Sequence, residues 1–155
     1  MTKDDFIRRV RGCERRLYRV ARTLLPCEAD CEDAVQEALL KAWAKRHTLR
    51  EEAYFETWLM RILINQCRTF YRRRPRGETA LTEDIPCPEA PDSSLLQALR
   101  ALPKKTGIAL ELHYIEGYSV RECAGMLGIP EGTVKWRLSQ GRGQLRRAIG
   151  EEDQT

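Results

Sequence analysis

The sequence predicts an all-α protein of two small helical domains joined by a flexible linker. Apolar residues recur three and four positions apart over most of the chain, and no alternating strand pattern is present. The exception is the stretch 75–92, "PRGETALTEDIPCPEAPD", which has four prolines, five acids and no helical period. We therefore expect an N-terminal domain at 1–74, a linker at 75–92 and a C-terminal domain at 93–150.

Composition excludes several classes of protein. The chain has 155 residues and a net charge of +4, and no apolar run approaches the roughly 18 to 20 residues of a membrane span, so no membrane insertion is expected. The first residues, "MTKDDFIRRVRG", lack the apolar stretch and cleavage site of a signal peptide, which predicts a cytoplasmic protein. Phosphate-binding loop, dinucleotide, zinc-protease and serine-hydrolase motifs are absent, so we expect no enzyme and no cofactor.

The six cysteines are expected to be mostly reduced thiols. Three of them lie where a helix would bury them, namely Cys13, Cys67 and Cys123. Cys27 and Cys31 have the spacing of half a zinc site, but no second ligand pair follows, so a metal or redox site is the less favoured alternative. His47 and His113 have no partner motif and are expected at the surface or in packing.

Two amphipathic helices open the N-terminal domain. The apolar stripe of the first consists of Phe6, Val10, Cys13, Leu17, Val20 and Leu24. This helix ends before Pro26, and Asp30 is expected to cap the next one, with Asp33 completing a weak capping box. The buried side of the second helix consists of Val35, Ala38, Leu39, Ala42 and Trp43.

The opposite side of this second helix gathers Asp33, Gln36, Glu37 and Leu40. A solvated polar face is one interpretation. However, an exposed leucine surrounded by acids and an amide is also typical of a surface that binds a partner helix.

The third predicted helix, 54–74, is apolar at its start and basic at its end. Arg61, Asn65, Arg68 and Arg72 share one face, and six arginines without an acid lie between 61 and 76, which predicts a phosphate-attracting surface. Tyr71 and its neighbour Phe70 can supply stacking surface for unpaired bases. For Phe70, a place in the core is an equally good alternative.

The C-terminal domain begins with a serine-capped helix in "DSSLLQALRALP", and a second helix, "KKTGIALELHYIEG", is closed by Gly117. Ser119 and Glu122 then form a capping box, and Gly128 ends that helix. A turn through Ile129 and Pro130 leads directly into a basic helix. This is the helix-turn-helix pattern, whose second helix enters the major groove of DNA.

The basic helix, "GTVKWRLSQGRGQLRR", carries a tryptophan on the side predicted to face solvent. Its core stripe is predicted to consist of Val134, Leu138, Leu145 and Ile149. Trp136 and Gln140 point away from this stripe, where they can contact a thymine methyl and a base edge. The alternative is that Trp136 packs on the first domain or on the linker. Gly141 and Gly143 each cost about 1 kcal/mol relative to alanine, and we expect them to mark where the helix bends or frays.

These segments together resemble a known family. The runs "CEDAVQEALLKAW", "FETWLMRILINQCRTFYRRR" and "LPKKTGIALELHYIEGYSVRECAGMLGIPEGTVKWRL" occur in the order found in bacterial sigma factors of the sigma-70 family. The short two-domain layout is similar to that of the extracytoplasmic-function (ECF) group, and the likeness covers residues 5–149. The resemblance implies a noncatalytic factor that binds core RNA polymerase and directs promoter-specific initiation.

The resemblance also implies roles for the faces described above. In region 2 (1–74), it implies docking on the clamp helices of core RNA polymerase by Asp33, Gln36, Glu37 and Leu40. It implies recognition and melting of the −10 element by Arg61, Asn65, Arg68, Tyr71, Arg72 and Arg73. In region 4 (93–150), it implies reading of the −35 element by Thr133, Lys135, Trp136, Arg137, Ser139, Gln140 and Arg142. Such factors commonly have an anti-sigma partner.

Two departures from the family pattern are visible. Trp136 replaces a frequent serine, and "SQGRGQL" replaces a more basic stretch, so the promoter preference is open. Gly107 and Gly125 stand in helices where the family has larger residues, which predicts a C-terminal domain that is marginally stable alone.

Two other classes of function remain as alternatives. A stand-alone helix-turn-helix regulator would use residues 118–148 but neither the arginine face nor Leu40, and an RNA-binding adaptor would bind single strands without polymerase.

Overall fold

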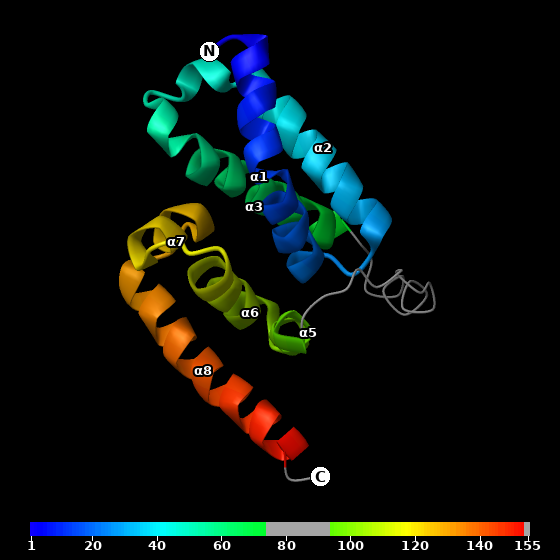
Figure 1. Ribbon diagram of the computed structural model, residues 1–155, viewed down its shortest axis with the longest axis vertical. Coiled ribbons are helices and arrows are strands. Elements are labelled where there is room, and N and C mark those ends of the chain that lie inside the picture. The colour runs from blue at the N-terminus through cyan, green and yellow to red at the C-terminus, as the bar shows by residue number, and fades with distance from the viewer. Residues whose placement is uncertain (74–93, 154–155) are drawn as a thin grey trace. The chain divides into compact units, whose positions relative to one another are not determined.

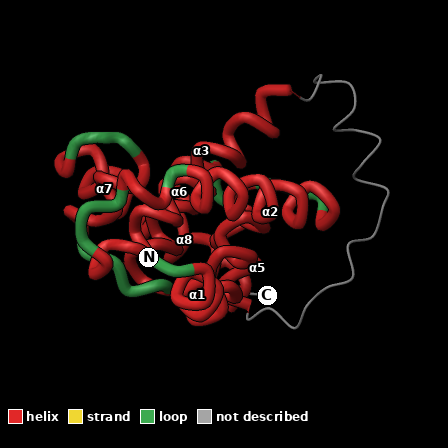
Figure 2. The backbone as a smooth tube through the Cα atoms, turned by 90° about the horizontal axis from the view of Figure 1, so that it is seen from above, coloured by secondary structure: helices red, strands yellow, loops and turns green. Residues whose placement is uncertain are grey.

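The computed structural model describes residues 1–73 and 94–153, without the side chains of 151–153, and the predicted linker at 75–92 lies outside this part of the chain. The regular elements in the described residues are all helical, which confirms the predicted all-α class (Figure 2). The chain divides into two compact units, Met1–Cys87 and Pro88–Thr155. In the described ranges, no helix combines the length and apolar character needed to cross a membrane.

The first unit is built from three long helices (Figure 1). Its elements are α1 (Lys3–Leu24), α2 (Glu28–Ala44), the short 3-10 helices η1 (Arg46–Thr48) and η2 (Glu52–Tyr54), and α3 (Phe55–Arg73). Helix α3 packs against both α1 and α2. Its fully buried side chains include Leu59, Leu63 and Ile64. The apolar stripe predicted for α1 is buried except for Val10, which is half-buried.

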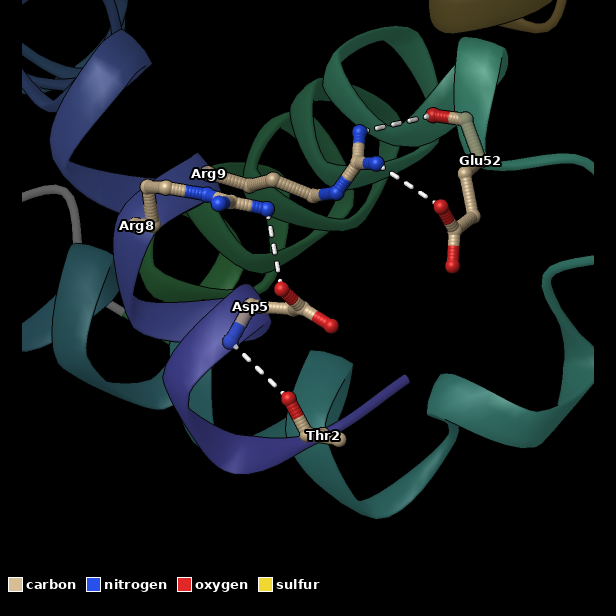
Figure 3. A network of polar contacts seen from close by, with 5 residues as sticks. All are labelled: Thr2, Asp5, Arg8, Arg9 and Glu52. Carbon is tan, nitrogen blue, oxygen red and sulfur yellow. Dashed lines mark hydrogen bonds and ion pairs between the residues drawn. The ribbon is translucent and has the colours of Figure 1, made fainter.

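Polar contacts fix the start of α1 and of α3. The Thr2 hydroxyl caps α1 by accepting a hydrogen bond from the Asp5 backbone N–H at 3.2 Å, and the Arg8 guanidinium pairs with Asp5 at 2.9 Å (Figure 3). Arg9 donates both to the backbone oxygen and to the carboxylate of Glu52, at 3.2 and 2.8 Å. Because Glu52 opens η2, immediately before α3, these bonds tie the approach to α3 onto α1.

The structure corrects the predicted start of α2. This helix begins at Glu28, and Cys27 occupies the N-cap without a side-chain hydrogen bond, so Asp30 is not the cap. Asp30 instead lies in the first turn, where a carboxylate interacts favourably with the helix dipole. An acid near a helix start therefore pointed to the right region but the wrong position.

The second unit contains α5 (Ser94–Ala101), α6 (Lys104–Leu110), a π-helical turn η3 (Glu111–Ile115), α7 (Val120–Leu127) and α8 (Glu131–Asp153). The predicted capping box is present, since the Ser119 hydroxyl accepts from the Glu122 N–H at 3.1 Å and the Glu122 carboxylate accepts from the Ser119 N–H at 3.0 Å. Gly117 and Gly128 have φ angles of 81° and 70°, the left-handed region that ends a helix. These elements confirm the helix-turn-helix of α7 and α8.

Helix α8 runs without interruption from Glu131 to Asp153, so the predicted fraying at Gly141 and Gly143 is wrong. Gly141 is buried because α8 passes very close to α6: a Cβ atom there would lie 2.6 Å from Leu110 Cδ1 and 2.8 Å from Thr106 Cγ2. Gly107 permits a second close approach, since its Cβ would lie 2.6 Å from the Leu99 carbonyl oxygen.

The predicted core stripe of α8 is correct only in its first half. Val134 and Leu138 are buried, Leu145 is half-buried, and Ile149 is 44 % exposed. No described side chain of α8 beyond Gly141 is buried. Ile149 therefore does not belong to the core, because the helix continues past the elements that cover its first half.

Candidate protein- and DNA-binding surfaces

The first candidate surface lies on α2. Asp33, Gln36, Glu37 and Leu40 are all exposed, and Leu40 is 65 % exposed although Ala38 and Ala42 beside it are buried. The helix thus presents an apolar side chain to solvent among acids and an amide. This is the arrangement expected for a protein partner.

A groove of about 440 Å³ adjoins this face, and sequence reasoning missed it. The groove is lined by Lys3, Phe6, Ile7, Gln36, Leu39, Leu40 and Trp43. Two of its lining side chains are aromatic, and the ring centroids of Phe6 and Trp43 lie 5.2 Å apart in an edge-on arrangement. Outside the groove, the Arg46 guanidinium lies 3.8 Å from the Trp43 ring centroid. The half of the groove that α1 supplies could be found only by knowing that α1 and α2 pack together.

The second candidate surface lies on α3. Arg61, Asn65, Arg72 and Arg73 are exposed, and Arg68 is half-buried. The opposite side of the helix is buried through Leu59, Leu63 and Cys67. One face therefore carries Arg61, Asn65, Arg68 and Arg72, whereas Arg73 projects from the end of the helix in another direction. This face combines cations for phosphate with an amide for a base.

Two aromatic residues lie near the C-terminal end of α3, Tyr71 beside this face and Phe70 on the side of the buried stripe. Tyr71 is 53 % exposed, whereas Phe70 is half-buried, so Phe70 belongs fully neither to the core nor to the surface. Gln66, which the sequence did not single out, is buried and accepts a hydrogen bond from Lys41 Nζ at 2.6 Å. This bond joins α3 to α2, the two helices that carry the first two surfaces.

The third candidate surface lies on the first half of α8. Lys135, Trp136, Ser139, Gln140 and Arg142 are exposed, and Thr133 and Arg137 are half-buried. Val134 and Leu138 hold the opposite side in the core. Trp136 is 63 % exposed, so its indole is not part of the core of its own unit. The linker, on which it could alternatively pack, lies outside the described residues.

Sequence reasoning also missed a partner of Arg142. Its guanidinium donates a hydrogen bond to the Tyr114 hydroxyl at 2.6 Å, between α8 and η3. The Nδ1 atom of His113, next to Tyr114, lies 2.8 Å from the Tyr118 carbonyl oxygen. Of the two roles predicted for this histidine, surface or packing, it therefore has the packing role.

Among the described cysteines, Cys13, Cys31, Cys67 and Cys123 are buried and Cys27 is half-buried. None of the described cysteines forms a disulfide, and the described ranges hold no group of three potential ligands around a common metal position. Cys13, Cys67 and Cys123 are buried as predicted, while Cys87 lies outside the described residues. Burial, with a smaller effect of the Glu56 carboxylate, raises the pKa of Cys13 from 9.0 to about 11.

Comparisons with known proteins agree with this geometry. The family model for sigma-70 region 2 matches residues 9–77, and the model for sigma-70 region 4 matches residues 92–145. The ECF RNA polymerase sigma factor SigM of Mycobacterium tuberculosis is 35% identical over 143 residues, covering 88% of this chain and 72% of SigM. The RNA polymerase sigma-E factor of Streptomyces coelicolor is 30% identical, covering 96% and 88% of the two chains.

A solved structure is also similar. The sigma factor RpoE from Bartonella quintana, crystallised in complex with the anti-sigma factor NepR, matches with a TM-score of 0.79 and 26% identity. The match covers 94% of this chain and 97% of the other. The two helical units described above are thus those of a known protein architecture.

Proposed function

Because the chain belongs to the sigma-70 family and is an ECF sigma factor, which directs RNA polymerase to promoters and performs no catalysis itself, we propose that its three exposed faces divide this task. The α2 face binds core polymerase, the α3 face recognises and opens the −10 element, and the α8 face reads the −35 element. Residues 1–74 then act as region 2 and residues 93–150 as region 4, tethered by 75–92. The observation that carries this proposal is that each face projects from a helix whose opposite side is buried.

On α2, Leu40 is the anchor for the clamp helices of the polymerase. A leucine that is exposed beside an apolar groove gains free energy when a partner helix covers it. Asp33, Gln36 and Glu37 surround Leu40, where they can pair with polar side chains at the rim of that interface.

On α3, melting requires a surface that prefers single strands to duplex. Arg61, Arg68 and the arginines at the end of the helix attract the phosphates, and Asn65 hydrogen-bonds a base that has left the stack. Tyr71 offers a ring on which an unpaired base gains about 1 to 3 kcal/mol by stacking. The polymerase performs the chemistry.

On α8, reading uses both base edges and the backbone. Gln140 can hydrogen-bond a base edge, Trp136 can cover a thymine methyl group, and the basic residues around them contact phosphates. A tryptophan in the major groove therefore favours base steps that contain thymine, because its large apolar ring can cover the methyl group.

The surroundings of the protein follow from the same argument. A factor that works on polymerase and DNA operates in the cytoplasm. Its three proposed binding faces carry exposed side chains that a second protein can cover. The structurally similar RpoE was crystallised in complex with an anti-sigma factor. We therefore infer an anti-sigma partner that competes with core polymerase for this chain.

Run-off transcription tests the proposal. Core polymerase without a sigma factor is incubated with fragmented DNA of the source genome, with and without this protein. Discrete new transcripts that share two upstream elements at a fixed spacing are expected. Tight duplex binding by the protein alone without transcripts would support a stand-alone helix-turn-helix regulator, and tight binding of single strands would support an RNA-binding adaptor.

A further inference from the structure

We propose that Tyr114 and Arg142 form a joint clamp for one backbone phosphate at the edge of the −35 duplex. The inference rests on the proposed function, because it requires α8 to lie along DNA. Tyr114 belongs to the π-helical turn η3, is 51 % exposed and accepts a hydrogen bond from Arg142 at 2.6 Å. Short π-helical turns of this kind are frequent at functional sites.

The chemistry of the pair suits a phosphate. Since the Tyr114 oxygen accepts from Arg142, its own O–H points away from the guanidinium and can donate to another group. The guanidinium of Arg142 retains further N–H donors in a planar fork. Two donors of this kind, one of them charged, lie side by side and match two oxygens of a phosphate group.

The position on the helix indicates a backbone contact rather than a base contact. Arg142 follows Ser139 by three residues and Lys135 by seven, so these three side chains share one flank of α8. Trp136 and Gln140 lie on the neighbouring face, which is the one proposed to enter the groove. A flank beside a groove-reading face lies along the phosphates.

The pair is held in place from both sides. The Tyr114 ring meets His113 edge-on at 4.8 Å, and His113 is itself held at the Tyr118 carbonyl oxygen. On the other side, the backbone of α8 next to Arg142 is seated against α6 at Gly141, where a Cβ atom would meet Leu110. A clamp positioned before binding loses less conformational entropy when the phosphate arrives.

The test uses the complete holoenzyme and a promoter found by the run-off experiment. Tyr114→Phe removes the hydroxyl alone and is expected to weaken promoter binding about tenfold, by the same factor for every −35 sequence tried, because a phosphate contact carries no sequence information. Arg142→Ala is expected to lower the slope of log affinity against log salt concentration by about 1. Arg146→Ala removes the same charge one turn along the same flank of α8, so it controls for the loss of charge without the loss of the Tyr114 hydrogen bond.

A double-mutant cycle isolates the pair. The effects of Tyr114→Phe and Arg142→Ala should be strongly non-additive, whereas those of Tyr114→Phe and Arg146→Ala should add. Additive effects in both cycles would overturn the clamp. Unfolding temperatures equal to that of the wild type would ensure that the losses do not reflect a damaged fold.

The failure of this inference is distinguishable from the failure of the proposed function. If Tyr114→Phe binds promoters like the wild type while Trp136→Ala still alters −35 preference, α8 reads DNA but the pair is only structural. If Trp136→Ala and Gln140→Ala are also without effect, the assignment of α8 to the −35 element is wrong and the clamp with it.

Discussion

Replacing Gly141 by alanine should destabilise the second unit, although alanine is the better helix former. Two of the glycines in α8, Gly141 and Gly143, differ in their surroundings. A Cβ at Gly141 would lie 2.6 and 2.9 Å from Cδ1 and Cγ of Leu110, and 2.8 Å from Thr106 Cγ2. A Cβ at Gly143 would have only the Arg147 guanidinium nearby, at 3.9 Å. Gly143→Ala is therefore a control with the same chemical change in the same helix.

The magnitudes follow from two opposing effects. In both variants, alanine gains about 1 kcal/mol of helix propensity over glycine. At Gly141 the new methyl group must displace Leu110, which is 1 % exposed and packed on all sides, and overpacking of this kind costs about 1 to 3 kcal/mol. We expect Gly143→Ala to raise the free energy of unfolding by about 1 kcal/mol. Gly141→Ala should lower it by up to about 2 kcal/mol, and the difference between the variants is the overpacking cost alone.

Native-state hydrogen exchange of the α6 and α8 amides in the full chain measures this free energy for the second unit separately from the first. Amides of α1 to α3 serve as an internal reference that neither substitution should change. If both variants stabilised α8 equally, the close packing of α8 on α6 would be refuted, and with it the reason given for a buried glycine at 141.

Four further predictions concern the other surfaces and the thiols. Leu40→Glu should weaken binding to core polymerase by about 2 kcal/mol or more without changing the unfolding temperature, and unchanged affinity would remove this face from the interface. Trp136→Ala should alter −35 preference but not polymerase binding, as promoter selection from a randomised −35 library would show. If the selected −35 sequences were unchanged, the indole would have a packing role and would not read DNA. Arg61→Ala combined with Arg68→Ala should impair duplex opening more than polymerase recruitment, with opening measured by the permanganate reactivity of unpaired thymines. Equal losses of opening and recruitment would indicate that these arginines provide only electrostatic attachment. The stability that the raised pKa of Cys13 provides is complete below pH 9 and is lost as pH rises toward 11. The free energy of unfolding, measured with urea, should therefore fall over this range by more in the wild type than in Cys13→Ala.

Local patterns were predicted well from the sequence because they depend on neighbours along the chain. The stripe from Phe6 to Leu24 needs only the helical repeat, and the capping box needs only a serine and a glutamate three positions apart, Ser119 and Glu122. The exposed faces of α2, α3 and α8 were found in the same way, as the remainder of each helix after its buried side was assigned.

Features that depend on two distant helices were missed or misassigned. Gln66 reads as a polar residue of α3, and the group that donates to its buried amide oxygen, Lys41 Nζ, lies on α2. Ile149 continues the apolar repeat of α8, yet within the described residues its side chain stays 44 % exposed. From the sequence alone, Gly141 is only an unfavourable residue in a helix, and its packing against Leu110 of α6 explains why no side chain stands there. Helical periodicity predicts which side of a helix is apolar, but it carries no information about where the covering helix ends.

The outward direction of Trp136 is a consequence of the fold of the second unit. Rotating α8 far enough to bury the indole would expose Val134 and Leu138, which are 0 % and 3 % exposed, and would move Gly141 away from its close contact with Leu110. Gly141 follows Trp136 by five residues, about 140° around the helix, so the packing side and the reading side are nearly opposite. Substitutions at 136 and 140 can therefore change the bases that are read while the packing at 134, 138 and 141 stays intact, which lets promoter preference vary without loss of the fold.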